Sequence, residues 1–475
     1  MANTGFQTSY GDESPIAAFA TTPGNGALTL IRCSGKGSIE IASAVFASAG
    51  KNNEQLLLEA KGSTVIHGWI VSCGETKEKI DEVLVSVFRA PKSYTGEDSL
   101  DISCHGGGSA GKAVMAALKT AGFRSALPGE FTFRAFMNGK IDLTKSESVM
   151  ELVCAKTETG RRHAILRLSG ALLNEINEIK NLLVQVLAGA EIYLDYSEDE
   201  VSADNEEEIA GMLPNKDIAL QALTRLKKLS NSWQLERIYQ EGITLVIAGS
   251  PNAGKSSLFN SLLKEDRSIV TEIPGTTRDW IEAFVSVEGI PVRLVDTAGL
   301  RETDDSVEKI GVERSRKIME EADIVLYLFG GEAGCQNEIL KDVTVPCLYI
   351  WNKSDIAPLP QPFPITGINP VSVSAKTGEG LAQLFAAITS IVMQQTAFFT
   401  ESSDAASLGT ERQKKLVDAA CCALEEAFAL TESSSPLDLI APLLREAVNS
   451  LGEITGEVST ADILEEMFSK FCVGK

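Results

Sequence analysis

The sequence predicts a multidomain fold: an α+β domain first, then an all-α helical domain that is interrupted by an inserted α/β domain. Strand-like and helical runs mix over about the first 120 residues. Apolar residues then recur at helical spacing, and from about residue 241 to 393 apolar strands alternate with helices. The helical pattern returns near residue 410, so the two helical halves are expected to bury their apolar stripes against each other.

These changes of pattern give predicted boundaries. The four segments are 1–125, the N-terminal α+β domain; 126–238, the first part of the helical domain; 239–393, the inserted α/β domain; and 394–475, the second helical part. A chain of 475 residues is long enough for two to four domains, each with its own core.

In the first segment we expect strands at 27–32 and 82–87, a helix at 110–120 and a turn at 23–26. The next helical stripe consists of Leu172, Ile176, Ile179, Leu183, Val186 and Ala190. The acidic stretch 198–208 is predicted to be a solvated connection.

The final segment carries a second helical stripe, made of Leu437, Ile440, Leu444, Val448 and Leu451. Ser435 and Pro436 are expected to be its N-cap and first-turn residues, and Gly452 its terminator.

Composition excludes several classes of protein. No apolar run reaches the roughly 18–20 residues of a membrane span, and no basic segment followed by an apolar core marks a secretory signal. Nine cysteines without a CxxC pair and three histidines argue against a zinc or His-rich metal site. We therefore expect a cytoplasmic protein with reduced thiols. Its net charge of −22 indicates that most contacts to a nucleic acid would fall to a basic partner.

Residues 249–256 read Gly-Ser-Pro-Asn-Ala-Gly-Lys-Ser, between an apolar strand at 243–248 and an amphipathic helix. In that context GxxxxGKS is a phosphate-binding loop, because glycines let backbone N–H groups converge on anionic oxygens at a helix N-terminus. Lys255 is expected to reach the β- and γ-phosphates, and Ser256 to hold Mg²⁺.

Four further segments follow in order at 275–279, 294–299, 348–355 and 373–376. Thr277 is placed to complete Mg²⁺ coordination, Asp296 to bind Mg²⁺ through water, and the Gly299 N–H to sense the γ-phosphate. The Asp355 carboxylate can accept from guanine N1–H and N2–H₂, which adenine does not offer, while the Ser-Ala-Lys segment at 374–376 closes over the base. Together these segments predict a GTPase.

Two positions depart from Ras-like GTPases. Leu300 stands where those enzymes carry the water-orienting Gln, so either hydrolysis is very slow or another group does this work. The candidates in the following segment are Arg301, Glu302, Asp304, Asp305, Glu308 and Glu313. Asn252 could contribute an amide oxygen to a monovalent-cation site that neutralises charge on the leaving phosphate.

Further motifs lie outside the inserted GTPase domain, in the first, second and last segments of the chain. Residues 93–98 read Ser-Tyr-Thr-Gly-Glu-Asp, 104–107 Cys-His-Gly-Gly, and 471–475 Phe-Cys-Val-Gly-Lys. Residues 128–143 read Pro-Gly-Glu-Phe-Thr-Phe-Arg-Ala-Phe-Met-Asn-Gly-Lys-Ile-Asp-Leu. With the inserted GTPase, the whole chain resembles the MnmE (TrmE) family of tRNA-modification GTPases.

The resemblance implies a K⁺-activated GTPase that acts with the flavoprotein MnmG (GidA), which carries FAD. Together they would add an aminomethyl-type group, such as carboxymethylaminomethyl, at carbon 5 of the tRNA wobble uridine. The one-carbon unit would come from a tetrahydrofolate derivative, 5-formyl- or methylene-tetrahydrofolate, bound by an N-terminal domain that also forms the homodimer. No membrane partner is implied.

The resemblance also implies residue roles. Glu308 would orient the attacking water; Ser256 and Thr277 would hold Mg²⁺; Asn252, Thr271, Ile273 and Thr276 would hold K⁺; and Arg32, Asp101, Lys140 and Lys475 would bind folate. With the motifs, it gives the GTP-binding set Asn252, Ala253, Gly254, Lys255, Ser256, Ser257, Thr271, Glu272, Ile273, Pro274, Gly275, Thr276, Thr277, Asp296, Thr297, Ala298, Gly299, Asn352, Lys353, Asp355, Ser374, Ala375 and Lys376.

Some alternatives stay open at this stage. Cys472 is either a catalytic thiol or a positioning residue, and His105 fits a hydrogen-bonded structural residue better than a base. The alternative function is a GTP-dependent binding switch in ribosome assembly, which would bind ribosomal RNA and no folate.

Overall fold

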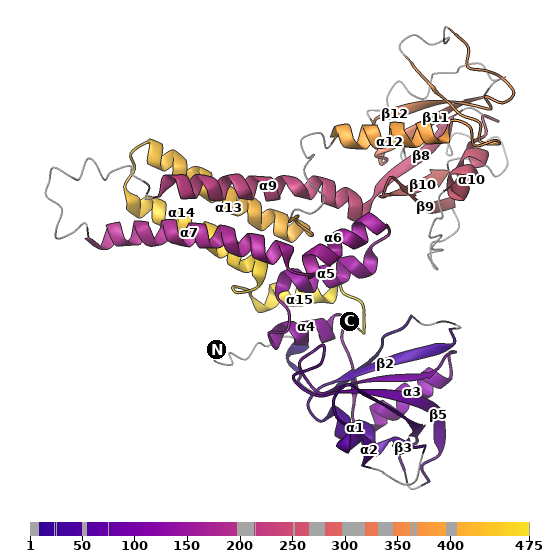
Figure 1. Ribbon diagram of the computed structural model, residues 1–475, viewed down its shortest axis with the longest axis vertical. Coiled ribbons are helices and arrows are strands. Elements are labelled where there is room, and N and C mark those ends of the chain that lie inside the picture. The colour runs from indigo at the N-terminus through magenta and orange to yellow at the C-terminus, as the bar shows by residue number, and fades with distance from the viewer. Residues whose placement is uncertain are drawn as a thin grey trace, which may run out of the picture. The chain divides into compact units, whose positions relative to one another are not determined.

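A computed structural model describes residues 9–22, 24, 26–49, 55–74, 76–196, 213, 215–249, 252–265, 281–296, 319–330, 345–361, 363, 368–395 and 406–474 (Figure 1). Contacts divide the chain into two compact units. The first comprises Met1–Met150, Ile176–Asn215 and Glu426–Lys475, and the second Glu151–Glu175 and Lys216–Glu425. The fold class is as predicted, but residues 151–175, which were expected in the helical domain, belong to the same unit as the inserted domain. The four predicted boundaries therefore stay a prediction.

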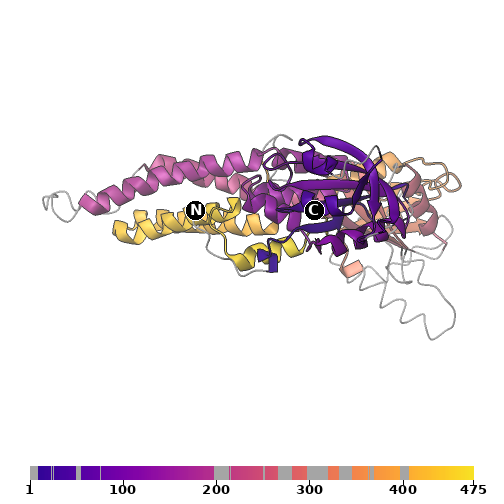
Figure 2. The ribbon, with the colours of Figure 1, turned by 90° about the horizontal axis from the view of Figure 1, so that it is seen from below.

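A mixed sheet in the order β3-β4-β5-β6-β2-β1-β7 forms the start of the first unit. Its strands are β1 (Ile16–Phe19), β2 (Leu28–Ser34), β3 (Phe46–Ser48), β4 (Thr64–Val71), β5 (Lys79–Phe88), β6 (Ser99–His105) and β7 (Arg124–Ser125). All pairs are antiparallel except β1–β7. Figure 2 shows these indigo-to-purple strands curving across one another, as the twist of strands requires.

Three helices, α1 (Ser38–Ala44), α2 (Leu56–Glu59) and α3 (Ala110–Ala121), cover one face of this sheet. Period-two alternation sends one set of strand side chains into that core, including Val83, Val85 and Val87 of β5. The predicted strands at 27–32 and 82–87 and the helix at 110–120 are confirmed.

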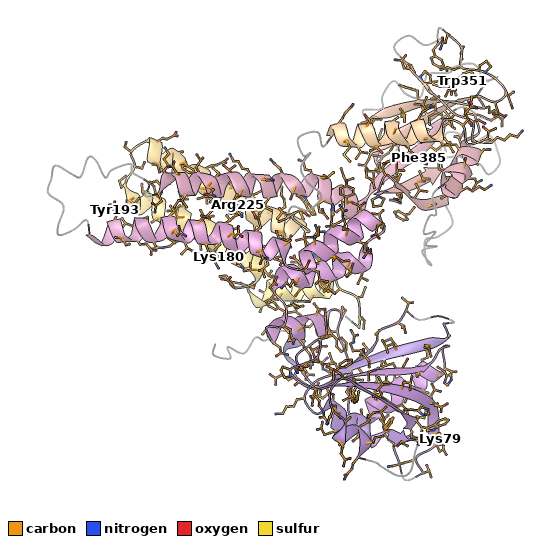
Figure 3. All side chains as sticks on the ribbon, viewed as in Figure 1. Lys79, Lys180, Tyr193, Arg225, Trp351 and Phe385 are labelled. Carbon is orange, nitrogen blue, oxygen red and sulfur yellow. The ribbon has the colours of Figure 1, made fainter. Side chains whose placement is uncertain are left out.

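The helices of the middle and end of the chain are α4 (Glu130–Met137), α5 (Leu143–Cys154), α6 (Glu158–Leu168), α7 (Ala171–Tyr196), α9 (Lys216–Glu241), α13 (Glu411–Glu432), α14 (Leu437–Thr455) and α15 (Ala461–Ser469). All six residues of the stripe predicted on α7 are fully buried. Ion pairs add to this packing: Arg225, labelled in Figure 3, lies 2.7 Å from Glu175. Among the described residues, no helix is both long and apolar enough to cross a membrane.

The ends predicted for the last long helix were wrong. Pro436 is the N-cap in place of Ser435, and the helix continues through Gly452 to Thr455. It ends at Gly456, whose φ of 88° is left-handed, because that conformation lets its N–H reach back to the Gly452 carbonyl. Gly452 is buried inside the helix. Of the predicted stripe, Ile440, Leu444 and Leu451 are buried, while Leu437 and Val448 are half-buried.

The inserted domain in the second unit is built on a sheet ordered β13-β12-β11-β8-β10-β9. Its described elements are β8 (Ile243–Gly249), α10 (Lys255–Glu265), β9 (Ile281–Val287), β10 (Ile290–Asp296), β11 (Ile324–Gly330), β12 (Cys347–Asn352), β13 (Val371–Ser372) and α12 (Leu381–Gln395). All pairs are parallel except β9–β10, so the predicted parallel sheet carries one antiparallel edge strand.

Each face of this sheet is covered by its own cluster of apolar side chains. Leu245 and Ile247 of β8 point into one cluster with α10 and α12, and Val246 and Ala248 into the other. Because β8 is buried on both faces, its sequence is an uninterrupted apolar run. The carboxyl ends of β8, β10 and β12 carry the polar motifs described next.

Candidate nucleotide site

The phosphate loop owes its shape to glycines at close contacts. Gly249, at the end of β8, has φ 139°, and a Cβ there would lie 2.3 Å from the Leu328 carbonyl oxygen on β11. Gly254, with φ 89°, would bring a Cβ within 2.4 Å of the Asn352 amide nitrogen. Only glycine fits both positions without displacing backbone or a buried side chain. α10 then begins at Lys255.

Asn352 connects the phosphate loop to the base loop. Its side chain is buried; the amide nitrogen donates to the Ala253 carbonyl at 2.8 Å, and the amide oxygen accepts from the Ala375 N–H at 3.1 Å. The phosphate loop and the base loop are therefore held together by one side chain. Next to it, the Ser374 hydroxyl donates to Asp355 Oδ1 at 2.7 Å, a bond that orients the carboxylate.

The phosphate end of the site brings Ser256 and Asp296 together. The Ser256 hydroxyl lies 3.0 Å from Asp296 Oδ2, and Asp296 is 2% exposed. A hydroxyl and a carboxylate are the hard oxygen ligands that Mg²⁺ prefers, so these two residues fit the predicted metal. Lys255 Nζ lies 3.0 Å from the Gly249 carbonyl oxygen, at the mouth of the loop.

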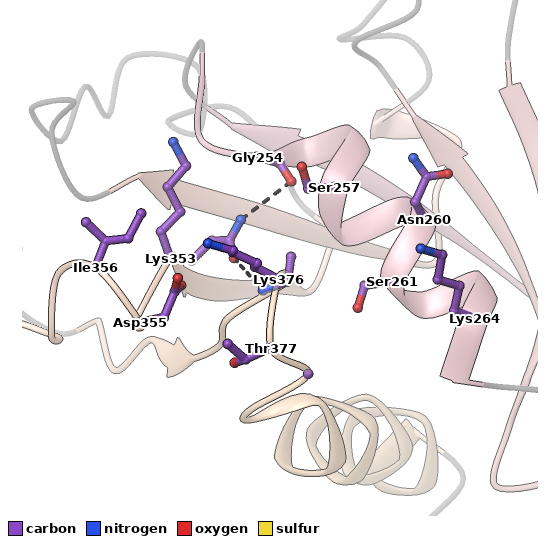
Figure 4. A pocket seen from close by; sticks show the side chains of 13 residues that line it. Gly254, Ser257, Asn260, Ser261, Lys264, Lys353, Asp355, Ile356, Lys376 and Thr377 are labelled. Carbon is purple, nitrogen blue, oxygen red and sulfur yellow. Dashed lines mark hydrogen bonds between the residues drawn. The ribbon is translucent and has the colours of Figure 1, made fainter.

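A cavity of about 660 Å³ opens beside these groups, within the range of small-molecule sites (Figure 4). In Figure 4, Lys353, Asp355 and Lys376 approach it from the base-binding loops, and α10 borders it on the other side. Of the predicted residues, the cavity lining includes Gly254, Ser257, Asn352, Lys353, Asp355, Ala375 and Lys376.

The sequence reasoning missed six lining residues, namely Asn260, Ser261, Lys264, Ile356, Thr377 and Gly378. The first three could have been found, because from Ser257 they recur at helical spacing and so share the face of α10 that looks into the cavity. Ile356, Thr377 and Gly378 follow the two base motifs directly, and no pattern in the sequence distinguishes them.

Many predicted GTP-site residues lie outside the described residues. These are Thr271, Glu272, Ile273, Pro274, Gly275, Thr276, Thr277, Thr297, Ala298, Gly299, Leu300, Glu308 and the other acidic and basic candidates of 301–313. Of the predicted K⁺ ligands, only Asn252 is described; it is exposed and has a left-handed φ of 62°.

The predicted folate residues of the first unit lie around the Ser93–Asp98 loop. Arg32 and Asp101, opposite each other on β2 and β6, form an ion pair of 3.0 Å, and Arg32 lies 5.8 Å from the Tyr94 ring centroid. Lys140 Nζ donates to the Pro91 carbonyl at 2.9 Å. Arg32 thus lies close to Tyr94 of this loop, and Lys140 contacts the segment just before the loop. Lys475 lies outside the described residues.

Cys472 is exposed, on a segment docked against α4: the Gly129 N–H donates to its carbonyl at 3.2 Å. A Cβ at Gly129 would come 2.6 Å from the Phe468 carbonyl oxygen, so this close approach requires glycine. His105 is hydrogen-bonded, as predicted, with Nδ1 2.7 Å from Asp81. That bond raises the pKa of His105.

Comparison with known proteins decides the family. Residues 143–472 match the MnmE helical domain and residues 15–140 the TrmE N-terminus. The chain belongs to the MnmE family. It is 43% identical to the tRNA modification GTPase MnmE of Treponema denticola, over 98% of this chain and 99% of that one.

A second MnmE relative, from Carboxydothermus hydrogenoformans, is 41% identical over 98% of this chain and 100% of its own length. The solved G domain of the FeoB iron transporter of T. maritima is 27% identical with a TM-score of 0.24, covering 31% of this chain and 98% of that one. Membership of the MnmE family makes the chain a GTP hydrolase, as the nucleotide motifs predicted.

Proposed function

We propose that this GTPase is activated by K⁺ and works with the flavoprotein MnmG, which carries FAD. The complex adds a carboxymethylaminomethyl-type group at carbon 5 of the wobble uridine in tRNA, using a tetrahydrofolate one-carbon unit. The enzyme acts in the cytoplasm as a homodimer. The observation that carries this proposal is the near full-length similarity to relatives named tRNA modification GTPase, which extends over the folate motifs as well as the GTPase.

Different residues of the second unit bind the base, the phosphates and the metal ions. Asp355 accepts from the guanine edge while Ser374 fixes the orientation of its carboxylate. Lys255 binds the β- and γ-phosphates, and Ser256 and Thr277, with Asp296 through water, hold Mg²⁺, which neutralises charge on the phosphates. Asn252, Thr271, Ile273 and Thr276 hold K⁺ where an arginine finger would otherwise act. Glu308 orients the attacking water in place of the Gln that Leu300 replaces.

In the first unit, Arg32, Asp101, Lys140 and Lys475 bind the folate. The Arg32–Asp101 pair presents a donor and an acceptor side by side, which suits the pterin edge, and Lys140 suits a carboxylate. Cys472 acts beside this site, either as a thiol that takes part in the chemistry or as an anchor for the C-terminal segment.

The test is nucleoside analysis of tRNA by mass spectrometry in a strain that lacks this protein. We expect the modified wobble uridine to disappear and to return with the wild-type gene. Unchanged nucleosides would overturn the proposal.

Isothermal titration with 5-formyl-tetrahydrofolate distinguishes this function from the ribosome-assembly alternative, which predicts no folate binding. Binding that is lost in Lys140→Ala and kept in the control variant Lys79→Ala would support the folate role. No observation on the described residues favours the ribosome-assembly switch.

A further inference from the structure

The β9–β10 hairpin has its open end at the phosphate site. Its register runs from Val287 opposite Ile290, next to the turn, to Ile281 opposite Asp296. Asp296 is the residue that accepts from Ser256 at 3.0 Å. Any shift of β10 along or across the sheet therefore moves a carboxylate of the nucleotide site.

The closed end of the same hairpin rests on a part of the chain that precedes the insertion. Gly289, in the turn, has φ 83°, and a Cβ there would lie 2.3 Å from Thr159 Oγ1 in the first turn of α6. Gly242, between α9 and β8, would bring a Cβ within 2.3 Å of the Pro291 carbonyl oxygen. The hairpin therefore lies close to the Thr159 side chain of α6 and to the end of α9.

Lys156, just before α6, makes a polar contact between this part of the chain and the hairpin. Its Nζ lies 4.3 Å from the ring centroid of Phe284 on β9 and 3.4 Å from the Glu241 carbonyl oxygen. Phe284 is paired with Arg293 of β10. Burial lowers the pKa of Lys156, and the charge of Arg293 lowers it further.

The support on which the hairpin rests is itself firmly held. The Thr157 hydroxyl caps α6 by accepting from the Gly160 N–H at 3.2 Å. The Glu236 carboxylate on α9 accepts from His163 Nδ1 at 2.8 Å, and Arg167 lies 2.7 Å from the same carboxylate. A buried ion pair with this geometry resists displacement more than an exposed contact does.

From these contacts we propose that Lys156 is a positioning residue for GTP hydrolysis, acting through the β9–β10 hairpin on Asp296. The Lys156–Phe284 contact holds the middle of the hairpin against the segment that precedes α6, and the paired strands carry that constraint to the phosphate end. In the other direction, a nucleotide-dependent shift of Asp296 reaches α6 through the same strands. The proposal rests on the GTPase activity and on Asp296 serving at the phosphates, not on the tRNA chemistry.

The test compares steady-state GTP hydrolysis by the full chain and five variants. Lys156→Met keeps the length of the side chain and removes its charge, Phe284→Leu removes the ring face, and Lys156→Arg keeps a cation over the ring. We expect Lys156→Met and Phe284→Leu each to lower kcat about threefold or more with little change in GTP affinity. Lys156→Arg should restore most of the rate.

Lys227→Met, on α9, removes an exposed ion pair with Glu425 on α13; it is the matched control and should leave kcat unchanged. The double variant Lys156→Met/Phe284→Leu should be no slower than either single variant, because both remove one contact. Unchanged kcat in both single variants, or additive losses in the double variant, would overturn the proposal.

Hydrogen exchange provides a readout that does not depend on turnover. Peptides covering 156–168 should exchange at different rates with GDP and with a non-hydrolysable GTP analogue bound, and Lys156→Met should reduce that difference. Identical exchange in the two nucleotide states of the wild-type chain would also contradict the proposal. These outcomes concern GTP hydrolysis alone, so they do not depend on the result of the tRNA nucleoside analysis.

Discussion

At the scale of single residues, the nucleotide site depends on a few polar side chains with strict partners. Asn352 contacts both the phosphate loop and the base loop, and Asp355 is oriented by Ser374. The sequence identified each of these residues, because their motifs lie at strand ends in a fixed order. It did not show that Asn352 joins the loops, since its partners come from separate parts of the chain.

Asp355→Asn is expected to weaken GTP binding about tenfold to a hundredfold, since an amide accepts only one of the two guanine donors and opposes the other with its own N–H₂. Xanthosine triphosphate, with a carbonyl at carbon 2, should bind the variant better than GTP does. Competition between the two nucleotides measures this preference. Glu379→Gln, an exposed neighbour outside the cavity lining, is the control. A variant that still prefers GTP would refute the role of Asp355.

At the scale of elements, a buried polar cluster joins α5, α6, α9 and the segment before α13. Arg167, 1% exposed, lies 2.7 Å from Glu151 and from Glu236, and donates to the Ser407 hydroxyl at 2.9 Å. Glu236 stands just ahead of the inserted domain, and Ser407 follows it. The chain segments just before and just after the inserted domain therefore contact the same guanidinium group.

Arg167→Met should lower the free energy of unfolding of the second unit by about 3–5 kcal/mol, because it leaves Glu151 and Glu236 buried without their cation. Urea unfolding of the full chain, followed by hydrogen exchange within 216–249, gives the measurement. Arg237→Met removes an exposed pair with Glu241 on the same helix and should cost less than about 1 kcal/mol. Equal losses in the two variants would show that the cluster adds nothing beyond a surface pair.

At the scale of the whole molecule, the chain carries a net charge of −22, and a few of the carboxylates that the structure describes are buried in ion pairs. Glu236 is the clearest of the buried ones. Burial by itself would raise its pKa, but the hydrogen bond to His163 and the charge of Arg167 together lower the pKa to about 2.

Acid should therefore destabilise the second unit through Glu236. A lowered folded-state pKa contributes stability that is present above the ordinary value of 4.5 and is lost as pH falls toward about 2. Unfolding measured across this window should show a loss of stability that Glu236→Gln removes. Glu158→Gln, whose carboxylate pairs with Arg161 at the surface, should leave the pH profile nearly as in the wild type. A profile unaffected by Glu236→Gln would contradict the assignment.

The domain types, the guanine motifs and the family could all be predicted from the sequence, because each depends on local patterns. A glycine at a positive φ, an apolar strand and a polar residue at its carboxyl end are all encoded within a few neighbouring positions. The misplaced end of α14 marks the limit of such patterns: Gly452 tolerates a buried helical position, and tertiary packing placed the stop at Gly456.

Contacts between residues far apart in the chain became visible only in the folded structure. The sequence contains no spacing or motif that pairs Arg167 with Glu236, Lys156 with Phe284, or Thr159 with Gly289. The physical reason is that such contacts follow from how packed elements cross, and burial then makes a charge or a glycine indispensable at the crossing point. Residues 151–175 therefore belong to the same compact unit as the nucleotide site, although their sequence reads as plain helix.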